Sequence, residues 1–246
     1  MTNQIYLSLS LIKKISLFGN LSGKELQEIL QKAQIHQFKK GEILFSREDK
    51  ALHINLVLEG VVKLFISNEE GEETVLQIAD FDKTLNDIFS SKFQANAQAL
   101  EICKILTIPR LQAKEFAAKN LNFALNILNE TAEKNIQLTT QLAQQKLTNA
   151  KQKVGQFLLG MAFEKTGEKA KNITLKCDKS VVASYLGIKP ETLSRTLQKL
   201  KDDGEISVEK NQITLLQEHS LCHYCDSKIA EKCSRKTAHF CEQNQF

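Results

Sequence analysis

The sequence predicts an α+β fold with a β-roll at the N-terminus, one long helix after it and a winged helix-turn-helix beyond that helix. Short apolar runs separated by glycine turns fill residues 39–109, which is typical of a small barrel or roll. Gly and Pro are absent from residues 111–154, as a long helix requires. Two short helical patterns then flank Gly187.

These patterns divide the 246 residues into four parts. We expect a roll that serves as a sensor domain in residues 1–115 and a dimerisation helix in 116–147. A winged helix-turn-helix follows in 148–217, and a cysteine-rich tail occupies 218–246.

Composition and charge bound the class of protein. Hydrophobic residues make up 42% of the chain, and the net charge of +4 is too small by itself to indicate nucleic acid. No run of 18 apolar residues occurs, and Ile5–Ile12 lacks the basic-then-apolar order of a signal peptide, so we expect no membrane span and a cytoplasmic location. The chain has six cysteines, and four of them fall in its last 25 residues. In such a compartment this cluster indicates metal or redox chemistry rather than disulfides.

The elements of the first part follow from a change of period. Residues 9–36 have helical spacing, with a turn and helix start at Asn20-Leu-Ser-Gly. Strands are predicted at 40–45, 54–60, 61–66, 74–79 and 102–108, and the turns between them carry Gly41, Gly60 and Gly71.

The long helix carries an apolar seam close to a heptad repeat. A two-stranded coiled coil between protomers would bury it, with an Asn in the seam fixing the register. The alternative is a helix that packs on its own domain. The seam residues are Leu121, Leu125, Leu128, Ala132, Asn135, Leu138 and Leu142.

The helix pair is the most informative element. After a helix predicted from Gly155 to Lys171 and a strand at 173–175, Asp178 is a candidate N-cap. Gly187 ends one short helix, and Pro190 occupies the first position of the next. Leu193, Leu197 and Leu200 give that second helix a buried stripe, and residues 206–216 form a hairpin wing.

The second helix of such a pair reads base edges with its first turns. Arg pairs with guanine O6 and N7, and Glu accepts from cytosine N4. Residues 146–216 hold 13 Lys and Arg against 8 Asp and Glu, a local charge of +5 that suits phosphates. The side chains of this helix that we expect to face DNA are Glu191, Thr192, Ser194, Arg195 and Lys199.

The pattern Gly187-x-x-Pro-Glu-Thr-Leu-Ser-Arg resembles the recognition-helix signature of the CRP/FNR family of bacterial regulators. Lys40-Gly-Glu-Ile-Leu-Phe and Ile105-Leu-Thr-Ile-Pro-Arg are similar to that family's roll. The resemblance covers about residues 10–217 and implies a cupin-like, cyclic-nucleotide-binding-like roll and a homodimer on double-stranded DNA, with RNA polymerase as a candidate partner. Ser194, between Glu191 and Arg195, is similar to the FNR branch, which implies TTGAT-like half-sites. The resemblance also implies that Lys179 and Ser180 face DNA, at positions where the family contacts phosphates.

Cyclic nucleotides are disfavoured as the effector of this roll. Members of the family that bind them hold the cyclic phosphate with a Gly-Glu turn and an Arg, whereas residues 81–97 contain neither, and Phe93 falls at the Arg position. Lys83 or Lys92 could serve another anion.

His53 leaves haem open, although a lone His is more often structural. Cys103 is expected in the core. Cys177 lies before a helix, where a lowered thiol pKa would favour redox chemistry, but a purely structural role is the favoured interpretation.

The tail carries Cys222, Cys225, Cys233 and Cys241 in the spacing C-x2-C-x7-C-x7-C. Four cysteines suit an iron–sulfur cluster or zinc. The seven residues between Cys233 and Cys241 disfavour zinc, whose ligands usually come in closely spaced pairs. The FNR resemblance implies an oxygen-labile cluster of the 4Fe–4S type. Bacillus-type members also carry C-terminal cysteines, although their spacing differs. Structural zinc and free redox thiols stay open. Destruction of the cluster by oxygen or nitric oxide would then change the arrangement of the recognition helices in the dimer.

Two other classes of function remain to be compared. The helix pair could bind protein instead of DNA, in a zinc- or cluster-containing interaction protein. An enzyme is not expected, because the chain has no phosphate-cradling glycine loop and no nucleophile with its base.

Overall fold

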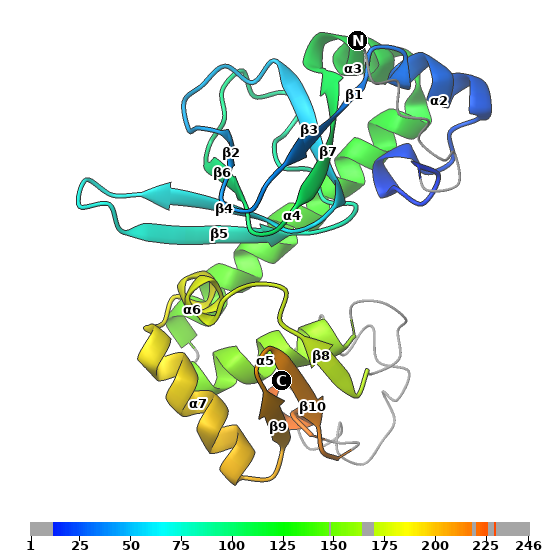
Figure 1. The fold of residues 1–246 in the computed structure, drawn as a ribbon. Helices are drawn as coiled ribbons and strands as arrows, with labels where there is room; N and C mark the ends of the chain where they lie inside the picture. The colour runs from blue at the N-terminus through cyan, green and yellow to red at the C-terminus, as the bar shows by residue number, and fades with distance from the viewer. Residues whose placement is uncertain (1–11, 148, 164–169, 218–219, 226–228, 230–246) are drawn as a thin grey trace. The chain divides into compact units, whose positions relative to one another are not determined.

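The computed structural model describes residues 12–147, 149–163, 170–217, 220–225 and 229. The chain forms two compact units, residues 1–140 and 141–246, which are described separately (Figure 1). Among the helices that the structure describes, none has the length and apolarity needed to cross a membrane.

The N-terminal segment is only partly helical. After a short 3-10 turn, η1 (Ser16–Phe18), helix α2 (Gly23–Leu30) begins where the sequence predicts, because Ser22 and Glu25 form a capping box. The helical expectation for residues 34–36 is wrong, since Gln34–Phe38 is strand β1, paired antiparallel with β7 (Cys103–Pro109). The pairing partner lies far away in the sequence, so the local period does not reveal it.

Two antiparallel sheets form the roll. One has the strand order β1-β7-β3, and the other has the order β2-β6-β4-β5. The predicted glycine turns are confirmed, because Gly41, Gly60 and Gly71 all have positive φ angles. The remaining strands are β2 (Ile43–Phe45), β3 (His53–Glu59), β4 (Val62–Ser67), β5 (Glu73–Ala79) and β6 (Asn96–Ala99), the last of which the sequence did not predict.

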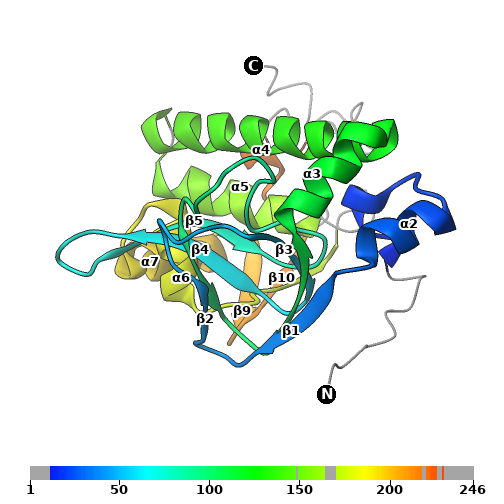
Figure 2. The same ribbon diagram turned by 90° about the horizontal axis from the view of Figure 1, so that it is seen from above.

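Alternation along β3 and β7 gives the central sheet two apolar faces. Val57 and Ile105 point into the interior of the roll, where they meet the second sheet. Leu56 and Leu106 point the other way and pack on helices α2, α3 (Arg110–Lys119) and the start of α4 (Leu121–Leu147). Figure 2 shows α2 and α3 together at one end of the roll.

The helical stretch without Gly or Pro contains a break at Asn120. The backbone of Asn120 is extended, and its Oδ1 accepts a hydrogen bond from the Phe123 N–H (2.9 Å), which starts α4 (Leu121–Leu147) in a new direction. Phe123 is fully buried against Phe116 and Phe18. The residues of the predicted seam, from Leu121 to Leu142, are all exposed in the single chain.

The first helix that lies wholly in the second unit is α5 (Ala150–Ala162), which starts at the Asn149 capping box, earlier than the Gly155 predicted from the sequence. Its sheet has the order β8-β10-β9. The other elements of this unit are β8 (Asn172–Thr174), α6 (Lys179–Leu186), α7 (Pro190–Asp202), β9 (Ile206–Glu209), β10 (Gln212–Leu215) and the 3-10 turn η2 (Cys222–Tyr224).

Candidate nucleic-acid interface

The turn between α6 and α7 has the geometry that the sequence predicts. Gly187 is left-handed (φ 63°, ψ 40°), and its N–H donates to the carbonyl of Ser184 at 3.1 Å. Pro190 occupies the first turn of α7. Asp178 stands at the N-cap position of α6, but its side chain makes no capping hydrogen bond.

Helix α7 is strongly amphipathic. Leu193, Leu197 and Leu200 are buried against α5, α6 and the hairpin β9–β10, so the opposite face of the helix remains available. Thr196 is also buried, and its hydroxyl donates to the Thr192 carbonyl at 2.8 Å.

The predicted DNA-facing side chains lie mainly on this available face. Glu191, Ser194 and Arg195 are exposed on the first turns of α7, and Lys199 is exposed further along. The remaining predicted positions are Ser180, exposed at the start of α6, and the half-buried Lys179 and Thr192.

The wing carries an exposed lysine, Lys210, that was not among the side chains predicted to face DNA. Strands β9 and β10 pair antiparallel, with Ile213 opposite Val208. Lys210 lies in the turn between them, is exposed and has a positive φ of 54°. A helix pair followed by a hairpin that exposes Lys210 in its turn is the arrangement of a winged helix.

Comparison with known proteins agrees with this geometry. Residues 152–224 match the family model of the Crp-like helix-turn-helix domain, and residues 35–120 match that of the cyclic nucleotide-binding domain. The chain belongs to the CRP/FNR family of transcription regulators. Its helix-turn-helix is therefore a DNA-binding domain, and its relatives are regulators rather than enzymes.

Individual relatives cover most of the chain. It is 28% identical to the transcriptional activator protein Anr of Pseudomonas aeruginosa, over 80% of this chain and 82% of that one. It is 27% identical to the nitrogen fixation regulation protein FixK of Bradyrhizobium diazoefficiens, over 83% and 87%. The solved structure of FixK2 from Bradyrhizobium japonicum has the same fold, with a TM-score of 0.73 at 19% identity over 79% of this chain and 98% of that one.

In this CRP/FNR chain, aromatic rings fill the inside of the roll. Phe93, at the position expected for an anion-binding Arg, is buried and stacks on Phe45 with the ring centroids 3.8 Å apart. Ala95, Ala97 and Leu85 complete the apolar wall. Phe93 therefore places an apolar ring where the family resemblance expects the cation that holds a cyclic phosphate, and the expectation that cyclic nucleotides do not bind stays a prediction.

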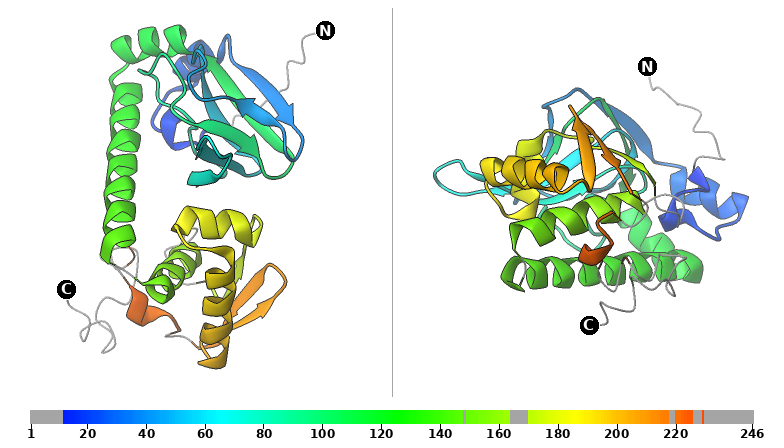
Figure 3. Two further views of the ribbon diagram at one scale, coloured as in Figure 1. Left: turned by 90° about the vertical axis from the view of Figure 1, so that its left-hand side faces the viewer. Right: turned by 90° about the horizontal axis from the view of Figure 1, so that it is seen from below.

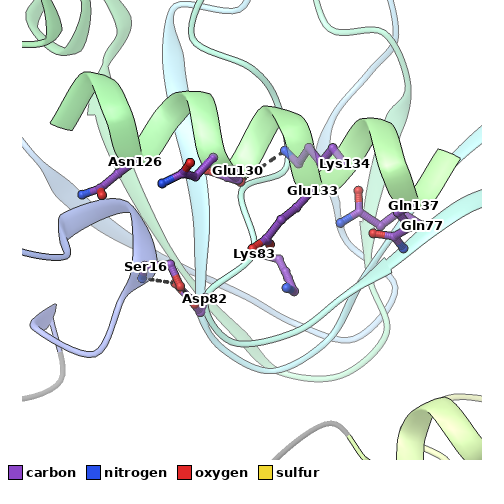
Figure 4. Close-up of a pocket in the computed structure, with 10 residues that line it drawn as sticks. Ser16, Gln77, Asp82, Lys83, Asn126, Glu130, Glu133, Lys134 and Gln137 are labelled. Atoms are coloured by element: carbon purple, nitrogen blue, oxygen red, sulfur yellow. Dashed lines mark hydrogen bonds and ion pairs between the residues drawn. The ribbon is translucent and has the colours of Figure 1, made fainter. Parts of the chain in front are cut away.

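Lys83 and Lys92, the other candidates for an anion, lie beside carboxylates. Lys83 lines a polar pocket between the roll and α4, where Figure 4 shows it near Asp82 and Glu133. Lys92 forms an ion pair with Glu48, its Nζ 3.1 Å from Oε2. The pocket holds three carboxylates against two lysines, which disfavours an anionic ligand. Its lining is Ser16, Gln77, Asp82, Lys83, Asn126, Asn129, Glu130, Glu133, Lys134 and Gln137.

The candidate haem and redox residues outside the tail are His53, Cys103 and Cys177. His53 is exposed at the start of β3. Cys103 is buried, and its Sγ lies 3.2 Å from the Val61 carbonyl oxygen. Burial, and then the charge of Asp178, raise the pKa of the Cys177 thiol to about 11, so that the helix start beside it does not activate the thiol.

The described part of the tail lies in the winged-helix unit. Cys222 and Cys225 are half-buried at the turn η2, where the Cys225 N–H donates to the Cys222 carbonyl at 3.0 Å. Cys233 and Cys241 lie outside the described residues. Among the residues that are described, no three His, Cys, Asp or Glu side chains form a metal-binding group, so the structure shows half of the predicted donor set.

Proposed function

We propose that this protein is a dimeric, cytoplasmic, FNR-like regulator that reads a palindrome with α7 and responds to oxygen, nitric oxide or redox state through an iron–sulfur cluster in its tail. The observation that carries the DNA-reading part is the exposed face of α7. Glu191, Ser194 and Arg195 extend from the first turns of a helix whose other face is committed to the core. These are the turns that enter the major groove in helix-turn-helix proteins.

Each exposed side chain then has a definite role. The guanidinium of Arg195 donates to guanine O6 and N7, and Glu191 accepts from a cytosine amine. Ser194 adds a hydroxyl between them, and Lys199 and Lys210 neutralise phosphates.

Titration of fluorescent duplexes with the full-length protein tests this proposal. We expect the palindrome TTGAT-N4-ATCAA to bind about 1,000-fold or more tightly than a duplex of the same composition with scrambled half-sites. Equal affinities for the two duplexes, with no other duplex preferred, would contradict it and would favour the protein-binding alternative for the helix pair.

Dimerisation follows from the apolar seam of α4. Leu121, Leu128 and Leu138 are 73%, 63% and 56% exposed, so the chain's own roll does not cover them. Pairing with a second copy would bury them and would hold two α7 helices for the two halves of a palindrome. Contact with RNA polymerase stays a prediction.

The tail cysteines fit a thiolate-bound metal group. Cys222 and Cys225 supply two sulfur ligands from a single turn, and Cys233 and Cys241 would complete four. A bound iron–sulfur cluster would supply sensitivity to oxygen and nitric oxide. Structural zinc remains the second candidate, because four cysteines satisfy it equally well.

Purification in the absence of oxygen, followed by analysis of iron, acid-labile sulfide and zinc, separates these candidates. We expect iron and sulfide in near-equal amounts in the wild-type protein and in Cys177→Ser. Cys222→Ser/Cys225→Ser should lose both. Zinc without iron would establish the zinc alternative, and a metal-free protein that still selects the palindrome would exclude both metals.

A further inference from the structure

The tail turn is packed into the core of the winged-helix unit. Leu221 and Tyr224 are 0% and 7% exposed, and both belong to the same apolar cluster as Val154, Leu158 and Leu200. Figure 3 shows η2 beside α5. The cysteine pair on either side of Tyr224 is thereby held against the DNA-binding unit.

Tyr224 occupies a notch that only glycine allows. A methyl group on Gly155, in the middle of α5, would lie 2.2 Å from Cδ2 and 2.4 Å from Cγ of the Tyr224 ring. Since carbon atoms do not approach so closely, any larger residue at position 155 would displace the ring. Gly160, five residues further along the same helix, has nothing within 4 Å of such a methyl group.

The backbone before η2 is held in a conformation that bulky residues avoid. Leu221 has φ 65° and ψ 0°. Such a residue keeps this conformation only where its surroundings enforce it. Here the side chain of Leu221 is fully buried, and its N–H donates to Glu205 Oε2 at 3.0 Å.

Glu205 connects the tail to the recognition helix. It follows the end of α7, and its own N–H donates to the Leu200 carbonyl at 3.0 Å. His223 Nε2 lies 3.6 Å from Glu205 Oε1. Next to it, Lys151 at the start of α5 forms an ion pair with Asp203 at 2.6 Å, which holds α5 to the end of α7.

We infer that Gly155 and Tyr224 form a dock that fixes the Cys222–Cys225 turn on α5, and that Glu205 joins this turn to the C-terminal end of α7. Gly155, Tyr224 and Glu205 are positioning residues. A group bound by the cysteine pair therefore acts on the recognition helix of the same chain. The inference rests on the proposed role of the tail as the sensor, and it names the route of regulation.

The test uses the full-length, metal-free, reduced protein without DNA. Iodoacetamide alkylation of Cys222 and Cys225 is followed by peptide mass spectrometry, and hydrogen exchange is measured at residues 201–205 and 221. In Gly155→Ala we expect alkylation of both cysteines to be about tenfold faster or more, with faster exchange at Gly204, Glu205 and Leu221. The matched control, Gly160→Ala, should behave like wild type in both measurements.

Tyr224→Ala keeps the test decisive if Gly155→Ala does not fold, because it empties the notch without adding a clash. Wild-type alkylation rates in every folded variant would overturn the dock. Faster alkylation with unchanged exchange at Gly204 and Glu205 would overturn the link to α7. Neither measurement requires DNA or a metal, so its failure is distinct from a failure of the palindrome titration or the metal analysis.

Discussion

At the scale of single residues, the ring of Phe93 lies where the family resemblance expects a cation in nucleotide-binding members. Its stacking on Phe45 makes the side chain part of the packing of the roll. The same position therefore changes from a contact for a charged ligand to a packing contact between the segment before β6 and strand β2. Sequence reasoning identified the missing Arg, but the partner ring could be found only from the folded roll.

Replacing Phe93 should accordingly change stability rather than ligand binding. We expect Phe93→Ala to lower the free energy of unfolding by about 3–5 kcal/mol, because it leaves a cavity in the roll. Phe89→Ala, at a ring that is 66% exposed, should cost less than about 1 kcal/mol. Urea unfolding measures both. A rise of the wild-type Tm in cyclic AMP would contradict this account.

Cys177 gives a prediction that depends on pH. Because burial raises the pKa of its thiol to about 11, the reactive thiolate forms only at high pH. In the native protein, alkylation of Cys177 should be slow at pH 8 and should accelerate as the pH approaches 11, whereas in urea it should accelerate near pH 8.5. Fast native alkylation at pH 7 would show an activated thiol and restore the redox interpretation of this residue.

At the scale of elements, local chemistry predicted the glycine turns and the starts of α2 and α7, but not the bounds of α5. A left-handed turn or a helix cap depends only on neighbouring residues, so it can be predicted from the local sequence. This holds for the turn at Gly187 and for the helix starts at Pro190 and Ser22. Strand β6 escaped prediction because Asn96–Ala99 is short and has small side chains that pairing alone makes into a strand. The break at Asn120 escaped because Asn occurs in helices as well as at caps.

Glycines in two helical contexts should respond in opposite ways to the same substitution. Gly187→Ala forces an alanine into the left-handed turn between α6 and α7 and should cost about 1–2 kcal/mol in the free energy of unfolding. Gly160→Ala, inside α5 with open space around it, should gain about 0.5–1 kcal/mol. Urea unfolding measures both changes. A stabilising Gly187→Ala would mean that the turn differs from the one described.

At the scale of the whole molecule, the proposed dimer covers the apolar seam of α4 with a second copy. Leu128→Glu should weaken the dimer by roughly 30-fold or more, on the order of 2 kcal/mol, because it places two carboxylates in an apolar interface. Leu111→Glu is the matched control, since Leu111 is 69% exposed on α3 and outside the seam. Sedimentation equilibrium measures both. A Leu128→Glu protein as dimeric as wild type would rule out this interface.

Only part of each candidate site could be predicted from the sequence. Its pattern placed Arg195 on the outer face of a helix, because period and turn chemistry are local. It also predicted that Cys222 and Cys225 act together. The notch at Gly155 that receives Tyr224 has no local signal, since the ring comes from a segment about 70 residues away in the sequence. Contacts of that kind follow from tertiary packing.

A double-mutant cycle between Arg195 and the guanine of TTGAT tests the central claim most directly. We expect replacement of that guanine by adenine to cost the wild-type protein about 1–3 kcal/mol in binding and to cost Arg195→Ala almost nothing. Arg195→Lys keeps the charge but lacks the two-pronged donor, so it should lose most of the discrimination. Equal losses for wild type and Arg195→Ala would show that Arg195 does not read this base.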